Sequence, residues 1–103
     1  NGTHNDGINI AAPLGTEVKA AADGKIVYVG NELRGYGNLI IIKHSGNILT
    51  AYAHSNEVIV AKNQTVKKGE KIATVGATGN VSSPQLHFGV RQGRKAVDPV
   101  SYF

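Results

Sequence analysis

Cysteine, methionine and tryptophan are absent from the 103-residue chain. Without cysteine no disulfide framework can form. The lack of thiols does not indicate in which compartment the protein works, since it suits an oxidising compartment and a small cytosolic domain alike. Long apolar runs are also missing: a run such as 39–42 is far shorter than the roughly 20 residues that span a bilayer. The start of the chain lacks the charged and apolar regions of a signal peptide, so we expect any targeting segment to lie outside these residues.

Charged residues are few as well, at 17% against 41% apolar residues, which excludes an intrinsically disordered chain. The 13 glycines, together with many valines and isoleucines, favour short strands joined by tight turns. We therefore predict an all-β fold. The length allows one domain over residues 1–103, which we expect to be the C-terminal part of a longer protein.

The chain carries 11 Lys and Arg against 7 Asp and Glu, giving a net charge of +4. A basic surface favours approach to an anionic wall polymer, an acidic partner or nucleic acid. The cations are scattered, and aromatic residues do not interleave with them as they do on single-strand binding surfaces. We therefore do not expect a nucleic-acid partner.

Glycine and proline divide the chain into segments with the composition of strands. The segment "NLIIIKH" is apolar on both strand faces and predicts a central, sandwiched strand. "HSGNIL" predicts a hairpin turn. The period of two along a strand predicts that Tyr52 and His54 share one face, with Ala51 and Ala53 on the other. The predicted strands are 16–20, 25–29, 38–44, 48–54, 58–60, 71–75 and 86–91.

The segments "EVKAAADGKIVYVG" and "TVKKGEKIATVG" echo each other. Both contain Val-Lys, a Gly turn, Lys-Ile and an apolar stretch that ends in Val-Gly. A duplicated β unit and coincidence both explain such an echo.

Histidine is the most informative residue type, and four are present: His4, His44, His54 and His87. A hydrolytic zinc site needs three side-chain ligands and an open position for water. Ligands on one strand must be spaced by an even number of residues to share a face, so a pair with His87 would need histidine at 85 or 89. Gln85 and Gly89 occupy these positions.

The run "GINIAAPLGTEVKAAADGKIVYVGNELRGYGNLIIIKHSGNILTAYAH", followed by "VKKGEKIATVGATG" and "QLHFGV", resembles the LytM-type domain of the lysostaphin-like zinc endopeptidases, which cut peptide cross-links in bacterial cell walls. The resemblance covers nearly the whole chain. It implies a compact, mostly antiparallel β domain with a groove across one sheet. Active members look like His-x-Gly-x-Asp near the start, Tyr-x-His in the middle and His-x-His near the end, and their metal is held by the first His, the Asp and the final His.

Matched to these motifs, Gly7 takes the place of the motif glycine, Asn5 that of the first ligand and Asn9 that of the carboxylate. Gln85 replaces the first of the paired histidines. In active members the His-x-His motif is followed by Phe-Glu, and Gly89 replaces that Glu. His54 matches the middle catalytic histidine. His87 matches the third ligand.

Amide oxygens are neutral and poor zinc donors, so two asparagines and one histidine should not retain a catalytic zinc ion. We therefore expect no cofactor and no hydrolysis. An alternative is an active zinc peptidase that uses His4, Asp6 and His87; because a shift of one residue turns a strand side chain to the other face, this would need a bulge or an adaptable terminus.

Structural interpretations compete with functional ones at single residues. His87 can be a histidine that is hydrogen-bonded at the edge of the core instead of a ligand. His44, at the end of the predicted core strand, is expected to be structural. Tyr36 in "RGYGN" is expected to line the groove, because loops carry binding residues.

Domains with this loss of ligands resemble the regulators typified by NlpD, EnvC and DipM, which activate periplasmic N-acetylmuramoyl-L-alanine amidases in cell division. The resemblance implies a periplasmic protein at the division septum, with a lipid anchor possible in the full protein. A module that only binds peptidoglycan is the other alternative. The expected partner-binding groove residues are Asn5, Asn9, Tyr36, His54, Gln85 and His87.

Overall fold

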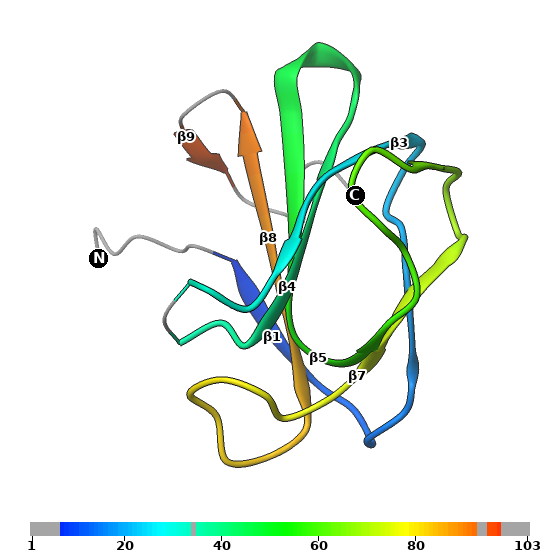
Figure 1. Ribbon diagram of the computed structural model, residues 1–103. Coiled ribbons are helices and arrows are strands. Elements are labelled where there is room, and N and C mark those ends of the chain that lie inside the picture. Colours follow the sequence, from blue (N-terminus) through cyan, green and yellow to red (C-terminus); the bar gives the residue numbers. More distant parts are fainter. Residues whose placement is uncertain (1–6, 34, 93–94, 98–103) are drawn as a thin grey trace.

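The computed structural model describes residues 7–33, 35–92 and 95–97, and within them it contains strands and one 3-10 turn (Figure 1). The predicted all-β class is confirmed. The strands are β1 (Ile8–Ala11), β2 (Glu17–Lys19), β3 (Gly24–Gly30), β4 (Asn38–Lys43), β5 (Ile48–Val58), β6 (Thr65–Val66), β7 (Lys71–Val75), β8 (Gln85–Gln92) and β9 (Lys95–Val97).

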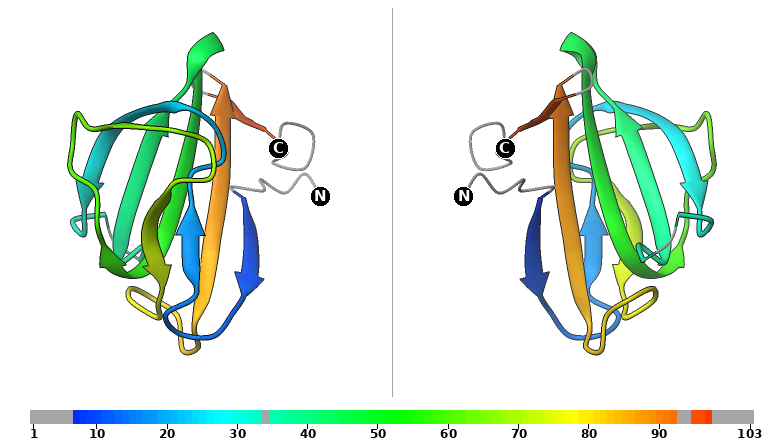
Figure 2. Two further views of the ribbon diagram at one scale, coloured as in Figure 1. Left: turned by 90° about the vertical axis from the view of Figure 1, so that its right-hand side faces the viewer. Right: turned by 90° about the vertical axis from the view of Figure 1, so that its left-hand side faces the viewer.

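All strand pairs are antiparallel, in the order β1-β8-β5-β4-β3-β6. β7 also pairs with β5, β2 pairs with β7, and β9 pairs with β8. Figure 2 shows β8 beside β1 at one side of the sheet, with β5, β4 and β3 following on the other side. Among residues 7–33, 35–92 and 95–97 no helix is long and apolar enough to cross a membrane.

Three strands were not predicted. β1, β6 and β9 have four, two and three residues, too few for an alternating pattern to stand out, and β1 is defined by its pairing with the distant β8. The predicted strand 58–60 is wrong: β5 continues to Val58, and residues 59–60 lie outside any strand.

The predicted hairpin is confirmed. β4 and β5 pair antiparallel around a 3-10 turn, Ser45–Asn47. Gly46 and Asn47 have φ values of 75° and 65°, a backbone region that glycine and asparagine tolerate best. The turn therefore sets the register of the two strands that form the centre of the sheet.

The core lies on one face of the central strands, where Ile40 and Ile42 of β4 are fully buried beside Tyr52 of β5. The prediction that β4 is sandwiched on both faces needs correction. Leu39 is buried, but Ile41 is only half-buried and lines a hollow on the outer face. One face of β4 thus builds the core, and the other contributes to a surface site.

A chain of hydrogen bonds crosses the core. The Tyr52 hydroxyl accepts a hydrogen bond from Ala21 N at 3.0 Å and lies 2.8 Å from Thr50 Oγ1. Thr50 Oγ1 is 2.7 Å from Nε2 of His44, whose Nδ1 is 2.7 Å from the Asp23 carbonyl oxygen. Burial raises the pKa of Tyr52, and the hydrogen bonds with Thr50 and Ala21 partly oppose the rise. His44 thus lies in the core, as expected for a structural histidine.

The sequence echo has a structural counterpart. One echoed segment contains β2 and β3, and the other contains β6 and β7. β2 pairs with β7, and β3 pairs with β6, so the first strand of each segment joins the second strand of the other. Such reciprocal pairing is what two equivalent units related by an approximate two-fold axis would make.

Candidate functional site

Asn9 and His87 lie directly opposite each other on β1 and β8. His87 Nδ1 is 2.7 Å from Asn9 Oδ1. Because an amide oxygen only accepts, Nδ1 carries the hydrogen and donates it. The register therefore places two groove residues expected from the sequence in direct contact through a hydrogen bond.

His54 reaches the same site because the backbone of β5 is irregular there. The register of β4 and β5 shifts between Asn38 and Ile40, and His54 has a φ of 67°. Between the pairs Asn38–Ser55 and Ile40–Tyr52, β5 has two residues where β4 has one. The extra residue in β5 breaks the side-chain alternation, as a β-bulge does. The predicted shared face for Tyr52 and His54 is consequently wrong: Tyr52 points into the core, whereas His54 lines a surface hollow with His87.

The His54 backbone and ring hold two loops. Its backbone N–H donates to the Tyr36 carbonyl oxygen at 2.9 Å, and Nδ1 is 2.8 Å from the Thr78 carbonyl oxygen. The ring is buried, with 6% of its surface exposed, and its centroid is 6.3 Å from that of His87. His54 therefore fastens the loop that carries Tyr36 and the loop that carries Thr78 to the sheet.

Close packing keeps these two loops together, and Figure 1 shows them side by side at the lower end of the sheet. Thr78 Oγ1 donates to the Ser55 carbonyl oxygen at 2.8 Å and accepts from Asn38 N at 3.1 Å. A Cβ on Gly37 would lie 2.4 Å from the Thr78 backbone, and one on Gly79 would lie 2.5 Å from Gly37 N. Both glycines are therefore required by the contact between the loops.

The loops and β8 enclose a polar hollow of about 290 Å³. All five expected groove residues that the structure describes line it, and Asn5 lies outside the described residues. The sequence did not single out Asn80 and Val81, whose only signal was their place after a glycine in a turn-rich loop. The lining consists of Asn9, Gly35, Tyr36, His54, Asn80, Val81, Gln85 and His87.

A second, apolar hollow of about 270 Å³ adjoins the first and shares Tyr36 and His87 with it. Its floor is low because two small residues, Ala51 and Gly89, lie opposite each other on β5 and β8. Its other lining residues are Leu33, Leu39, Ile41, Leu49 and Arg91. Sequence reasoning missed this hollow, although the apolar outward positions of "NLIIIK" were a signal for it. The two hollows form one groove along the outer face of β4, β5 and β8.

The described residues do not fit a catalytic zinc ion. Such an ion takes three imidazole, carboxylate or thiolate ligands. Within residues 7–33, 35–92 and 95–97 no group of three His, Cys, Asp or Glu side chains is arranged to hold a metal. Asn9, which the sequence matches to the carboxylate of the motif, accepts a hydrogen bond from His87 through its amide oxygen. His4, Asn5 and Asp6 lie outside the described part of the chain.

An antiparallel sheet with a histidine-lined groove defines the class of LytM-type domains. The chain belongs to peptidase family M23, whose profile matches residues 3–99. Solved structures share the fold: the catalytic domain of lysostaphin from Staphylococcus simulans is 33% identical with a TM-score of 0.89, covering 99% of this chain and 80% of that one. The catalytic domain of the prophage-encoded M23 protein EnpA from Enterococcus faecalis is 30% identical with a TM-score of 0.88, covering 99% and 81%.

Among curated relatives, the uncharacterized lipoprotein YgeR of Escherichia coli is 55% identical over 98 residues, which cover 95% of this chain and 39% of YgeR. The murein hydrolase activator NlpD of the same species is 54% identical over 98 residues, covering 95% and 26%. The cell division protein DipM of Caulobacter vibrioides is 49% identical over 104 residues, covering 95% and 17%. The chain thus spans less than half the length of each relative.

Proposed function

We propose that this domain is a non-hydrolytic regulator of peptidoglycan hydrolysis that binds and activates an N-acetylmuramoyl-L-alanine amidase. One observation carries the proposal. At the position of the metal-binding carboxylate stands Asn9, whose amide oxygen accepts a hydrogen bond from His87 at 2.7 Å. The groove keeps the shape of a peptidase site, and its described lining residues include no carboxylate that would hold a metal.

The chemistry of the donors supports the absence of hydrolysis. An amide brings no negative charge to Zn²⁺, and without bound zinc no water is acidified toward neutral pH. On this proposal the domain retains no catalytic zinc. His54 and His87 then serve as part of a binding surface.

The names of the relatives support the partner and the location. NlpD is named a murein hydrolase activator, DipM a cell division protein and YgeR a lipoprotein. On this proposal the protein acts in the periplasm at the division septum, and a lipid anchor would lie in a part of the protein beyond this chain. Peptidoglycan itself is a further possible ligand of the full protein.

The shape of the groove supports activation of an amidase that docks into it. It is built on paired strands and on loops fastened by His54 and Thr78, so it is preformed and orders little on binding. A domain that binds only the open form of an amidase shifts the amidase toward that form. Coupling of about 1–3 kcal/mol, which is common between binding sites, would give about 5- to 150-fold stimulation.

Release of dye from labelled peptidoglycan sacculi tests the proposal. The domain and a periplasmic amidase are measured alone and mixed, with the zinc content of the purified domain determined in parallel. We expect release to rise only in the mixture.

Two results would overturn the proposal. Digestion by the domain alone, with about one zinc per chain, would instead establish a peptidase that uses residues such as His4 and Asp6. Pull-down by sacculi without any effect on amidase rates would establish a wall-binding module.

A further inference from the structure

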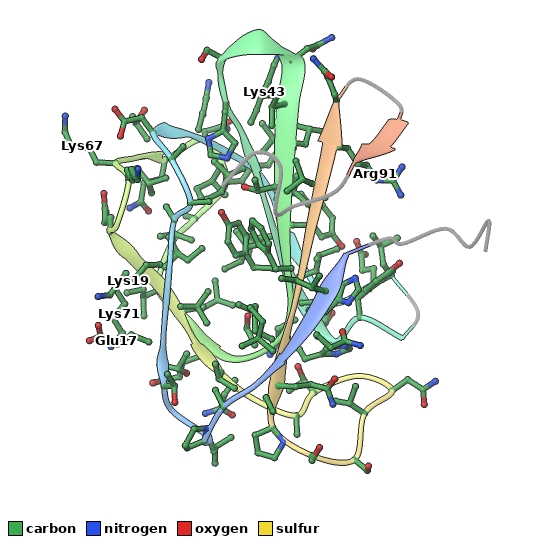
Figure 3. All side chains as sticks on the ribbon, turned by 180° about the vertical axis from the view of Figure 1, so that it is seen from behind. Glu17, Lys19, Lys43, Lys67, Lys71 and Arg91 are labelled. Atoms are coloured by element: carbon green, nitrogen blue, oxygen red, sulfur yellow. The ribbon has the colours of Figure 1, made fainter. Side chains whose placement is uncertain are left out.

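Three cations form a row across the outer face of the sheet, at the end of the groove remote from Asn9. Strand register places Lys25 of β3 opposite Lys43 of β4, Lys43 opposite Leu49 of β5, and Leu49 opposite Arg91 of β8. Directly opposite residues point to the same face of a sheet. Figure 3 labels Lys43 and Arg91 toward the same end of the molecule, whereas Lys19 and Lys71 lie together on another side.

Within residues 7–33, 35–92 and 95–97, no carboxylate compensates the positive charge of this row. The three side chains are exposed, and the described residues supply none of them with a carboxylate partner. Like charges directly opposite each other on neighbouring strands are destabilising. With strands about 4.8 Å apart, the Lys25 and Arg91 backbones at the two ends of the row are three spacings, or about 14 Å, from each other, so a single anionic segment can face the whole row.

The row closes one end of the apolar hollow. Leu49 and Arg91 both line that hollow, and His87 lines its other end. Arg91 lies four positions after His87 on the extended strand β8, which corresponds to about 13 Å. The groove therefore has a neutral polar end, an apolar middle and a cationic end.

We propose that this groove reads a peptide segment that is apolar along about 13 Å and acidic at one end, with its carboxylates on Lys25, Lys43 and Arg91. The inference rests on the proposed function and specifies the chemistry of the partner's docking segment. Leu33, which is 46% exposed at the rim, and Ile41 favour large apolar side chains over the hydroxylated sugars of a wall polymer. Charge at one end fixes the direction in which the segment lies.

Synthetic peptides test this surface independently of any amidase. Because β5 pairs with both β4 and β8, the floor offers few backbone partners, so the probe is a peptide held in a helix by a side-chain cross-link, in which part of the backbone is paired internally. It spans about nine residues, or 13 Å, with leucines on one face and three glutamates at one end. The comparison peptide has glutamine in place of each glutamate. Binding is measured by fluorescence anisotropy.

We expect the glutamate peptide to bind about tenfold or more tightly than the glutamine peptide, with the difference lost near 1 M salt. The double variant Lys43→Glu and Arg91→Glu should lose this preference, and the matched variant Lys62→Glu, on an exposed loop outside the groove, should keep it. Circular dichroism establishes that the variants are folded.

Equal binding of both peptides, or an equal effect of Lys62→Glu, would overturn the inference. So would binding of sacculi that depends on the row when peptide binding does not. If the peptides behave as expected but no amidase is stimulated, the docking surface stands and the proposed function fails.

Discussion

His87 donates its Nδ1 hydrogen to Asn9 Oδ1 across the β1 and β8 pair, at 2.7 Å. The contact places the ring hydrogen of His87 on Nδ1, so the lone pair of the neutral ring lies on Nε2. On the proposed function, the hydrogen bond between Asn9 and His87 takes the place of a metal ion in this groove.

The tautomer of His87 is the first prediction. In the folded domain at neutral pH, the ring should carry its hydrogen on Nδ1, because Asn9 Oδ1 can only accept. Nitrogen chemical shifts from long-range ¹H–¹⁵N correlation measure this directly. In Asn9→Ala the preference should weaken. A hydrogen on Nε2 in the unaltered domain would contradict the contact.

Restoring the lost ligands should restore metal binding. The double substitution Asn5→His and Asn9→Asp supplies, together with His87, two imidazoles and a carboxylate, the set that active relatives are expected to use. Zinc measured by mass spectrometry after dialysis should rise to about one ion per chain in this variant. Adding His87→Ala is the matched control and should abolish the gain. No gain would show that the residues around the site also prevent binding.

Tyr52 should make the domain sensitive to alkaline pH. Its pKa in the folded state is raised above the ordinary value of 10.0, mainly by burial, so its contribution to stability is complete below pH 10 and is lost as the pH rises through the folded pKa. Urea unfolding at pH 8 and pH 11 should show a fall in the free energy of unfolding. In Tyr52→Phe the fall should shrink, while stability at pH 8 drops by about 1–3 kcal/mol because Ala21 N and Thr50 lose a partner.

Tyr28→Phe is the matched control for that experiment. The Tyr28 hydroxyl is buried and has no hydrogen-bond partner among the described residues. Its removal should leave stability unchanged or raise it by up to about 1 kcal/mol. A loss as large as that of Tyr52→Phe would show that the effect comes from general packing of the rings.

The backbone conformation at His54 predicts an unusual order of stability for two variants, His54→Gly and His54→Ala. At φ 67° a side chain is strained, by about 1–2 kcal/mol, whereas glycine is not. Both His54→Gly and His54→Ala lose the bond to Thr78, so their difference isolates the backbone. His54→Gly should be at least as stable as His54→Ala in urea unfolding, although glycine is the weaker residue in an ordinary strand by about 0.5–1 kcal/mol. The reverse order would contradict the bulge.

Sequence reasoning located the strands with clear alternation and five of the eight residues that line the polar hollow, because both follow from local pattern and from motif position. It placed His54 on the wrong face, since the bulge in β5 is set by the pairing of Asn38 with Ser55, which no local pattern reveals. The apolar hollow was missed for a related reason. Its depth comes from Ala51 and Gly89 meeting across two strands that are distant in the sequence.

A substitution that fills the apolar hollow should weaken docking of the partner while leaving the stability of the fold nearly unchanged. Ala51 lies on its floor opposite Gly89, so Ala51→Leu places three additional carbons where a partner's side chain would enter. Because the position faces outward, the free energy of unfolding should change by less than about 1 kcal/mol. Amidase stimulation should nevertheless fall at least tenfold, as expected when a central apolar contact worth about 2 kcal/mol is lost. Ala61→Leu adds the same atoms at an exposed position that lines neither hollow, and it should stimulate normally. Full stimulation by a folded Ala51→Leu domain would place the amidase contact elsewhere on the molecule.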